Sequence, residues 1–367
     1  MKFILNWLRV PLRIATLGVV ALAVVAASRG PARAVEEEWR DPDGTPVERA
    51  ELVMGTMARV ALPPSRASAG AFEAAFAALR DVDATMSLYR PDSELVRVNA
   101  RAGAHPEPVD ATLFALLTRS RELGLESDGA FDVTVLPLLR LWGAYPELSY
   151  LGAGSVTAVG IEGLRLDGGT HTVSFARPGM GLDLGGIAKG FALDRARAAL
   201  AAAGVDRARL DLGGDLAFIG AGPEGAWRAA VRDPDAPDRP LGVLRVGADA
   251  SLSTSGNYNR DFAHEGWRVP SHIYDPRSGR PVTRDLAVTV WSPDATTADA
   301  LSTALVVLGP EGARALLARE PGAGALFAER RPGDAVRRVT LAGHPPLGWT
   351  PRTPEAPPPT VARGDHS

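Results

Sequence analysis

No cysteine occurs among the 367 residues of this chain. Disulfide bonds and thiolate metal ligands are therefore excluded, and so is a lipoprotein, whose lipid anchor needs a cysteine at the cleavage site. A strong excess of one charge is also lacking, because the net charge is −3 at pH 7 and no basic stripe with interleaved aromatic residues is present. We therefore expect no nucleic-acid partner.

The apolar run near the N-terminus, Ile14 to Ala27, is shorter than the roughly 20 residues that a membrane-spanning helix needs. Lys2, Arg9 and Arg13 precede this run, and the small residues of "ARA" at 32–34 fit a cleavage site. This pattern is typical of a secretory signal peptide, which we expect over residues 1–34. The protein is then exported to the periplasm, and an uncleaved N-terminal membrane anchor is the alternative.

The remainder of the chain contains neither an internal repeat nor a linker that divides it, so we expect one domain over residues 51–344. Residues 35–50 are polar and predict a flexible N-terminal segment. The proline-rich stretch 345–367 predicts a disordered tail, because it has few apolar residues to bury.

Strand-like stretches and separate helices follow one another without a regular alternation, which favours an α+β fold over a doubly wound parallel sheet. Amphipathic helices are predicted over 69–87 and 110–126, the second with Asp110 as its N-cap, and two more over 297–308 and 310–319. Strands are predicted at Leu52–Leu62 and at "HTVSF", "GLDL", "ARLDLGGDLAFIG", "WRAAVRDP", "LGVLRVG" and "SLSTSG".

The stretch "GLDLGGIAKGFALDRARAAL", Gly181 to Leu200, places two glycines and a lysine in front of an alanine-rich helix. A P-loop needs Ser or Thr after its lysine, whereas Gly190 follows Lys189, and the dinucleotide fingerprint is missing from this context. The simplest interpretation is a tight turn followed by a helix with Gly204 as its C-cap.

A packing turn leaves Asp183 and Lys189 unexplained. Adjacent glycines free backbone groups to face a ligand, and the N-terminus of the following helix favours an anion. Lys189 adds a positive charge there, and Asp183 can accept hydrogen bonds from a ring or a ribose. A phosphate or pyrophosphate site is therefore the functional alternative for this corner.

At this stretch the chain resembles a known family. "LDLGGIAKGFALD" is similar to the signature of the ApbE-like FAD:protein FMN transferases, which are exported flavin transferases. Further stretches resemble the family in its order, over residues 52 to 330: "MGT" at Met54–Thr56, "MSLYRPDSELVRVN", "GAFDVTVLPLLRLWG", "LDLGGDLAFIG", "SLSTSGNYNR", "SHIYDPRSGRPV" and "VWSPDATTADALSTALVVLG".

The resemblance implies a single ApbE-like, T-fold-related α+β domain with a mostly antiparallel sheet and flanking helices. It also implies Mg²⁺-dependent cleavage of the FAD pyrophosphate, with transfer of FMN to a Ser or Thr hydroxyl of an acceptor protein and release of AMP. Mn²⁺ is the alternative ion. The implied acceptor is a flavoprotein subunit of a membrane redox complex.

Two other functions stay open at this point. A periplasmic FAD pyrophosphatase would use the same metal and pocket but let water attack, releasing FMN and AMP. A non-catalytic FAD-binding protein would keep the ring contacts without needing metal ligands.

The resemblance assigns a cation site to Asp299, Thr303 and the backbone carbonyl of Gly186. Asp299 and Thr303 stand at i and i+4, hence on one face of the predicted helix. Ser302 occupies a position that carries a further carboxylate ligand in some members, so its role as a ligand is doubtful. The structural alternative is that Thr296 and Asp299 form a capping box.

Flavin contacts are likewise implied by position. His272 is a candidate for the base that accepts the proton of the incoming hydroxyl, since an imidazole titrates near neutral pH. Tyr274 stands where the family usually has an aliphatic residue. The residues implied to contact FAD are Met54, Tyr89, Ala130, Phe131, Asp132, Asp183, Lys189, Ile273 and Tyr274.

Overall fold

The computed structural model describes residues 39, 44–145, 148, 154–257, 262–264, 267–269, 271–334 and 336–352. The predicted signal peptide over 1–34 lies outside the described residues. Most of the predicted flexible segment 35–50 and of the predicted tail 345–367 also lies outside them.

An antiparallel eight-stranded sheet forms the centre of the molecule, in the order β1-β2-β6-β7-β10-β15-β16-β17. Each neighbouring pair in this sheet is antiparallel, so the predicted α+β class is confirmed. The strands are β1 Val47–Val53, β2 Thr56–Leu62, β6 Ala208–Leu212, β7 Asp215–Ile219, β10 Ser251–Gly256, β15 Asp285–Ser292, β16 Gly324–Arg330 and β17 Arg338–Gly343.

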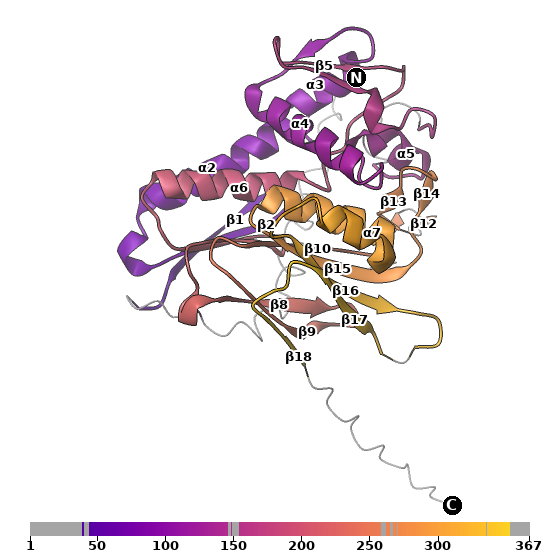
Figure 1. Ribbon diagram of the computed structural model, residues 1–367. Coiled ribbons are helices and arrows are strands. Elements are labelled where there is room, and N and C mark those ends of the chain that lie inside the picture. The colour runs from indigo at the N-terminus through magenta and orange to yellow at the C-terminus, as the bar shows by residue number, and fades with distance from the viewer. Residues whose placement is uncertain are drawn as a thin grey trace, which may run out of the picture.

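Three helices cover one face of this sheet: α2 Ala69–Met86, α6 Ala188–Ala202 and α7 Ala295–Leu317 (Figure 1). α2 lies where its amphipathic pattern predicts it, with Ser68 as N-cap. The predicted C-terminal glycine of α6, Gly204, has a φ of +78°, as a helix end requires.

α7 differs from its prediction at its start. Asp294 is the N-cap and accepts the amide of Thr297, so the helix begins at Ala295 and Asp299 lies inside it. The capping-box interpretation of Thr296 and Asp299 is therefore wrong. Gly309, with a φ of +69°, kinks the helix between the two segments that the sequence predicts.

α7 is also the one helix among the described residues that is long and apolar enough to cross a membrane by length and composition alone. Its buried face packs against β10 and β15, which gives its hydrophobic character a structural role in the core.

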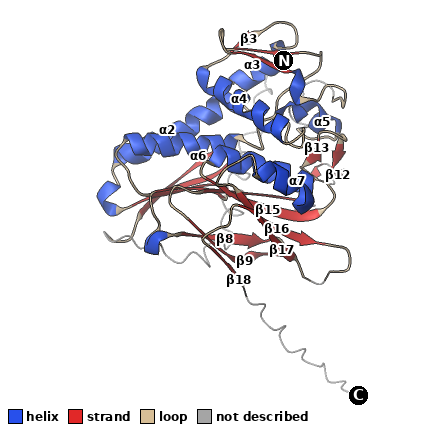
Figure 2. Ribbon diagram, viewed as in Figure 1, coloured by secondary structure: helices blue, strands red, loops and turns tan. Residues whose placement is uncertain are grey.

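A second, three-stranded sheet packs on the opposite face, in the order β18-β9-β8, from Gly348–Pro351, Ala236–Val246 and Trp227–Asp233 (Figure 2). Between the sheets the ring of Trp227 stacks on Phe218 at 4.6 Å, and Trp39 meets it edge-on at 5.1 Å. Trp227, Phe218 and Trp39 belong to a second hydrophobic core, which is separate from the main core beneath the helices.

These contacts correct two predicted boundaries. β18 lies within the predicted tail, because its backbone pairs with β9 and Trp349 packs against the second core. β1 begins at Val47, within the predicted flexible segment, because it pairs with β2 along its whole length.

The third part of the molecule lies beyond the helical layer and carries α3, α4 and α5 (Figure 1). Asp110 caps α4 as predicted, accepting the amide of Thr112 at 2.6 Å. The elements here are α3 Glu94–Arg101, α4 Ala111–Glu126, α5 Leu136–Leu141, β3 Glu107–Pro108, β4 Leu164–Asp167 and β5 Thr172–Phe175. Two short hairpins, β11 Phe262–His264 with β12 Trp267–Val269 and β13 Tyr274–Asp275 with β14 Arg280–Pro281, complete the strands.

Two predicted strands differ in detail. The stretch 52–62 is a hairpin, because Met54 and Gly55 have φ values of +52° and +71° and form the two-residue turn between β1 and β2. Residues 181–184 belong to none of the sheets among the described residues. Their backbone groups bond instead to α3 and to residue 133.

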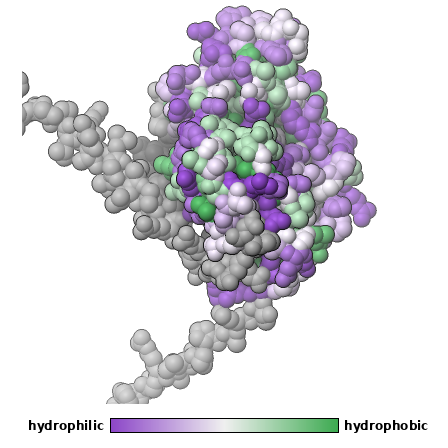
Figure 3. All heavy atoms as spheres, turned by 90° about the vertical axis from the view of Figure 1, so that its left-hand side faces the viewer, coloured by the Kyte–Doolittle hydropathy of each residue, from purple (hydrophilic) through white to green (hydrophobic). Residues whose placement is uncertain are grey.

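The surface of the protein carries both hydrophilic and hydrophobic residues. On the face drawn in Figure 3, hydrophilic residues run along much of the outline and hydrophobic residues gather in smaller groups between them. This face belongs to the side of α2 and β1 in Figure 1.

Candidate functional site

The glycine corner, residues 185–187, joins an extended stretch to the first turn of α6. In that stretch Leu182 donates its amide to Asn99 Oδ1 at 2.7 Å and accepts from the Asn99 amide group at 3.0 Å. Asp183 donates its amide to the carbonyl of Val133 at 2.8 Å. The corner is thereby fixed between α3 and the "GAFD" segment.

The first turn of α6 touches the first turn of α7 through a glycine. A Cβ atom on Gly190 would lie 2.1 Å from the carbonyl oxygen of Ala295 and 2.8 Å from Cβ of Asp299, so only glycine permits this approach. The close contact lets the Gly190 amide donate to Asp299 Oδ2 at 2.9 Å. The Asp299 carboxylate is therefore held at the N-terminus of α6.

Thr303 lies one turn further along α7, beside the glycine corner. A Cβ atom on Gly186 would lie 3.1 Å from Thr303 Oγ1 and 3.5 Å from the ring of Phe131. The structure thus brings together Gly186, Thr303 and Asp299, the three residues that the family resemblance assigns to a cation.

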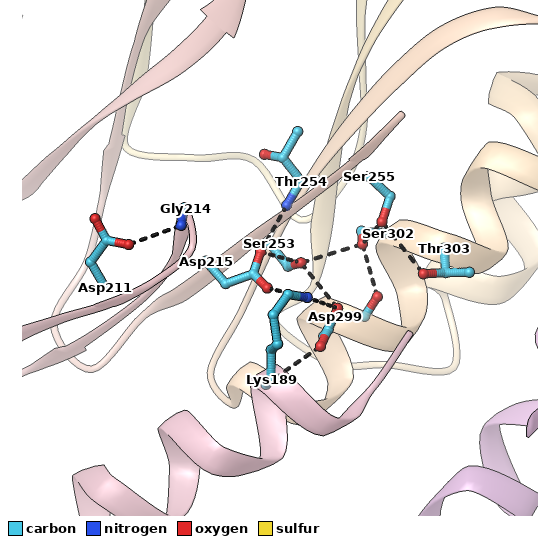
Figure 4. A network of polar contacts seen from close by, with 11 residues as sticks. Lys189, Asp211, Gly214, Asp215, Ser253, Thr254, Ser255, Asp299, Ser302 and Thr303 are labelled. Atoms are coloured by element: carbon cyan, nitrogen blue, oxygen red, sulfur yellow. Dashed lines mark hydrogen bonds and ion pairs between the residues drawn. The ribbon is translucent and has the colours of Figure 1, made fainter. Parts of the chain in front are cut away.

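A buried charge cluster adjoins these residues (Figure 4). Lys189 Nζ lies 2.8 Å from Asp215 Oδ2 and 3.4 Å from Asp299 Oδ1. Both carboxylates are nearly inaccessible, whereas the Lys189 side chain keeps 32% of its surface exposed. Lys189, predicted to meet phosphate charge, is therefore already shared by two protein carboxylates.

Burial and charge set the protonation of this cluster. Burial raises the pKa of Asp299 to about 6; the Lys189 ammonium opposes the shift, and the Asp215 charge adds to it. Burial lowers the pKa of Lys189, but Asp299 and Asp215 raise it by more, so it lies above its usual range. Lys189 is therefore a cation at any pH at which the protein would work.

Hydroxyl groups fill the space between β10 and α7. Ser302 Oγ donates to the carbonyl of Asp299 at 2.8 Å and lies 2.7 Å from Ser255 Oγ. Ser253 Oγ donates to Asp215 Oδ1 at 2.7 Å and contacts Asp299 Oδ1 at 3.4 Å. Ser302, the doubtful ligand, thus holds the helix against the strand.

The oxygen atoms at this site suit a hard divalent cation. Asp299 Oδ1 has only long contacts, both 3.4 Å, so the protein satisfies this carboxylate oxygen weakly. The described part of the chain contains no group of three or more His, Cys, Asp or Glu side chains that could hold a metal. A cation here would rest on one carboxylate, the Thr303 hydroxyl, the Gly186 carbonyl and oxygens of the bound substrate, as Mg²⁺ does with phosphates.

The "GAFD" segment lies directly behind the corner. Ala130, Phe131 and Asp132 are all buried, and Asp132 Oδ1 accepts the amide of Thr134 at 2.7 Å and its hydroxyl at 2.6 Å. The Phe131 ring would lie 3.5 Å from a Cβ atom on Gly186, so this side chain stands beside the corner. Asp132 acts as the cap of a short helix, which gives its carboxylate a structural partner.

Asp183 also has protein partners. Its Oδ1 accepts the amide of Gly185 at 2.7 Å, and its Oδ2 accepts the Tyr145 hydroxyl at 2.6 Å. The ring of Tyr89, largely exposed, lies 5.9 Å from that of Tyr145. Tyr145 therefore connects two residues of the predicted flavin site, Asp183 and Tyr89.

The "HIYDP" segment borders the same region through its hairpin. Ile273 and Tyr274 are buried, and a Cβ atom on Gly129 would lie 3.5 Å from the side chain of Arg277 in the turn that follows. His272 keeps an exposed surface, and packing around the ring lowers its pKa, so the imidazole is neutral at pH 7. A neutral imidazole can accept a proton.

Met54 lies in a turn that adjoins the glycine turn before Asp215, where the Gly213 amide donates to the carbonyl of Met57 at 3.1 Å. It packs against the main core from the turn between β1 and β2, and its assignment to the flavin remains a prediction.

Tyr274 stands where the family that the sequence resembles usually has an aliphatic residue. Tyr274→Phe tests what its hydroxyl group contributes to stability. The Tyr274 hydroxyl is buried and has no hydrogen-bond partner among the described residues, so its removal should leave the free energy of unfolding unchanged or raise it by about 1 kcal/mol. Tyr145→Phe is the matched control, because it removes a bonded hydroxyl and should cost about 1–3 kcal/mol. Urea denaturation measures both. A clear loss of stability in Tyr274→Phe would show that this hydroxyl has a partner.

Asp132→Asn tests the effect of burial on a carboxyl group. Burial raises the pKa of Asp132 to about 6, so its contribution to stability is full below about pH 4 and is lost as the pH rises through 6. An asparagine oxygen can accept the two Thr134 hydrogen bonds without carrying charge, while the bond from the Ile161 amide is lost and offsets part of the gain. We expect the variant to be more stable than the wild type by up to about 2–3 kcal/mol at pH 7.5.

At pH 5 the gain in stability of Asp132→Asn over the wild type should be smaller. Urea denaturation at pH 5 and at pH 7.5 measures the difference. An equal gap at both values would contradict the raised pKa. Asp167→Asn, at an exposed turn whose amide bond lowers the pKa, is the control and should show no such gain at pH 7.5.

The sequence analysis does not identify several residues of the site. Asp215, Ser253 and Ser255 become neighbours of Asp299 only when β7 and β10 pair. The stretch "LDLGG" at 210–214 repeats "LDLGG" at 182–186, but the repeated aspartate is Asp211, so the repeat carries no signal for Asp215.

A separate groove of about 500 Å³ lies between α4 and β4. It is lined by Phe114, Thr118, Arg121, Glu122, Glu162, Leu164, Arg165, Leu166 and Gly168, and none of the predicted site residues is among them.

A model of the ApbE family matches residues 54–327, which include the glycine corner, the "HIYDP" segment and Asp299. The chain belongs to the ApbE family. Known members have the same organisation. The FAD:protein FMN transferase of Treponema pallidum is 37% identical over 303 residues, which is 76% of this chain and 83% of that protein. The FAD:protein FMN transferase of Escherichia coli K12 is 32% identical over 280 residues, or 73% and 80%.

Solved structures of ApbE proteins share the fold. The flavin transferase ApbE from Vibrio cholerae has a TM-score of 0.68 at 28% identity, covering 81% of this chain and 97% of that one. The apo form of the flavinyl transferase ApbE from Pseudomonas stutzeri has a TM-score of 0.67 at 31% identity, covering 81% and 94%. The single ApbE-like domain that the sequence predicts is therefore confirmed.

Proposed function

We propose that this ApbE protein cleaves the pyrophosphate of FAD with the help of Mg²⁺ and transfers FMN to a Ser or Thr hydroxyl of an acceptor protein. As a member of a family whose relatives are named for that reaction, the chain is an FAD:protein FMN transferase. The observation that supports the cation most strongly is the convergence of Gly186, Thr303 and Asp299 at the N-terminus of α6.

The chemistry needs negative charge to be neutralised at a phosphorus atom while a hydroxyl attacks it. Mg²⁺, with Mn²⁺ as the alternative, would be held by Asp299, Thr303 and Gly186, and when bound it supplies positive charge to the pyrophosphate oxygens. The acceptor oxygen forms a bond to the FMN phosphorus, the bond to the bridging oxygen breaks, and AMP leaves with that oxygen.

The chain itself supplies orientation and a base. The N-terminus of α6 points its amides at the corner and favours an anion there. Tyr89, largely exposed beside Tyr145, offers aromatic surface for the flavin or the adenine, and the neutral imidazole of His272 takes the proton of the incoming hydroxyl.

Incubation of the mature protein with FAD, Mg²⁺ and an acceptor domain tests this function. We expect a flavin-fluorescent acceptor band in a denaturing gel, which disappears with EDTA and with an acceptor whose target hydroxyl is removed. FMN that appears only free in solution would instead identify an FAD pyrophosphatase, and retention of intact FAD would identify a binding protein.

The place of action is part of the same proposal. The pattern of residues 1–34 supports export to the periplasm, where the acceptor would be an exposed flavoprotein subunit of a membrane redox complex. Cell fractionation should find the processed chain in the periplasm. A chain that stays in the membrane fraction at full length would support the uncleaved anchor.

A further inference from the structure

Asp215 is a buried carboxylate for which the proposed reaction has no role. It stands at the start of β7, directly after the glycine turn that follows β6, and only 6% of its side chain is exposed. Burying a charge without a partner is costly, so its environment should show what it does. Its ionic partner is Lys189, the lysine that also reaches Asp299 (Figure 4).

Lys189 lies closer to one of its two carboxylate partners than to the other. Its Nζ atom lies 2.8 Å from Asp215 but 3.4 Å from Asp299, so the ammonium group stands closer to Asp215. Asp299 Oδ1 is left with two long contacts, to Lys189 and to Ser253. The Oδ1 atom of the carboxylate assigned to the cation therefore has no hydrogen bond or ion pair shorter than 3.4 Å among the described residues.

We propose that Asp215 holds the ammonium group of Lys189 away from Asp299 and thereby sets the affinity of the site for its divalent cation. This inference rests on the proposed function, because it takes Asp299 as a cation ligand. Asp215 is a positioning residue in this scheme and does not itself touch the cation.

Charge balance gives the direction of the effect. Two carboxylates around one ammonium leave the cluster with a net charge of −1, which attracts a divalent cation. Without the Asp215 charge the cluster is neutral, and Lys189 has Asp299 as its sole carboxylate partner. The lysine then competes directly with the cation for Asp299 Oδ1.

The position of Asp215 is fixed independently of Lys189. Its Oδ1 accepts the Ser253 hydroxyl at 2.7 Å and has the Thr254 amide at 3.4 Å, both from β10. Lys189 comes from α6 and Asp299 from α7, so the charges sit on three different elements. An asparagine at 215 can keep the bond from Ser253, which makes Asp215→Asn a change of charge with little change of shape.

The test measures Mn²⁺ binding to the mature protein saturated with FAD and without an acceptor, by isothermal titration calorimetry, with a titration of Mn²⁺ into FAD alone as the blank. We expect Asp215→Asn to weaken binding about tenfold or more, and Lys189→Met to tighten it, because the competing cation is gone. The double variant Asp215→Asn/Lys189→Met should bind more tightly than Asp215→Asn alone. A merely structural role would weaken binding in all three variants.

Asp211→Asn is the matched control. Asp211 lies on the neighbouring strand β6, where its Oδ1 accepts the amide of Gly214 and its Oδ2 lies 3.7 Å from Arg59. Its Mn²⁺ affinity should stay within about twofold of the wild type. In transfer assays Asp215→Asn should raise the Mg²⁺ concentration for half-maximal rate, while the rate at saturating Mg²⁺ recovers.

Two failures are distinguishable. In the first, Asp299→Asn abolishes Mn²⁺ binding, but Asp215→Asn binds Mn²⁺ like the wild type. The same conclusion follows if Lys189→Met and the double variant both bind Mn²⁺ more weakly than the wild type. Either result overturns this inference and leaves the cation site in place. If the wild type does not bind Mn²⁺, or Asp299→Asn binds as well as the wild type, the cation assignment fails and this inference fails with it.

Discussion

Asp299→Asn is expected to abolish FMN transfer, lowering the rate by about a thousandfold or more, while the fold persists. Asparagine can still accept the Gly190 amide, so the contact between α6 and α7 survives. What is lost is the negative charge of the carboxylate that is assigned to the cation. The measurement is the rate of acceptor flavinylation, together with the thermal unfolding midpoint, which should change little.

Asp294→Asn is the control for this prediction, because it changes a carboxylate at the start of the same helix. Asp294 caps α7 through the Thr297 amide, and asparagine caps helices equally well. Its transfer rate should be close to that of the wild type. Transfer by Asp299→Asn at the wild-type rate would refute the ligand assignment.

Gly190→Ala is expected to destabilise the whole domain. A Cβ atom would lie 2.1 Å from the Ala295 carbonyl oxygen and 2.6 Å from its carbon, and both are backbone atoms that cannot turn aside. α6 and α7 must separate, which we expect to cost about 3 kcal/mol and to lower the unfolding midpoint by roughly 6–12 °C. Calorimetry on the purified variant measures the shift.

The same separation moves the Gly190 amide from Asp299, so transfer should fall together with stability. Gly70→Ala is the control, since no atom lies within 4 Å of a Cβ built there, in the first turn of α2. It should leave the midpoint unchanged or raise it slightly. An unfolding midpoint of Gly190→Ala equal to the wild type would show that α6 and α7 do not touch as described.

Local patterns in the sequence predicted the amphipathic helices. α2 and α4 have periodic apolar faces and polar caps, Ser68 and Asp110, that can be recognised without knowledge of any partner. The pairing of Asp299 with Thr303 was predictable for the same reason, because one helical turn brings them together. Their proximity to Gly186 required the resemblance, since more than a hundred residues separate them.

What the sequence did not predict depends on contacts between distant segments. Asp215 becomes a neighbour of Lys189 only through the packing of α6 on the sheet, and Tyr145 meets Asp183 through a loop without a periodic pattern. β18 has few residues and a proline, and its order comes from pairing with β9. The turn at Met54 needs a positive φ that its sequence does not demand.

The most direct test is a crystal structure of the mature protein with FAD and Mn²⁺, with the metal located by anomalous diffraction. We expect the anomalous peak to contact the Asp299 carboxylate, the Thr303 hydroxyl and the Gly186 carbonyl, beside the two phosphates of FAD. A peak bound by other residues, or FAD phosphates remote from α7, would contradict the account.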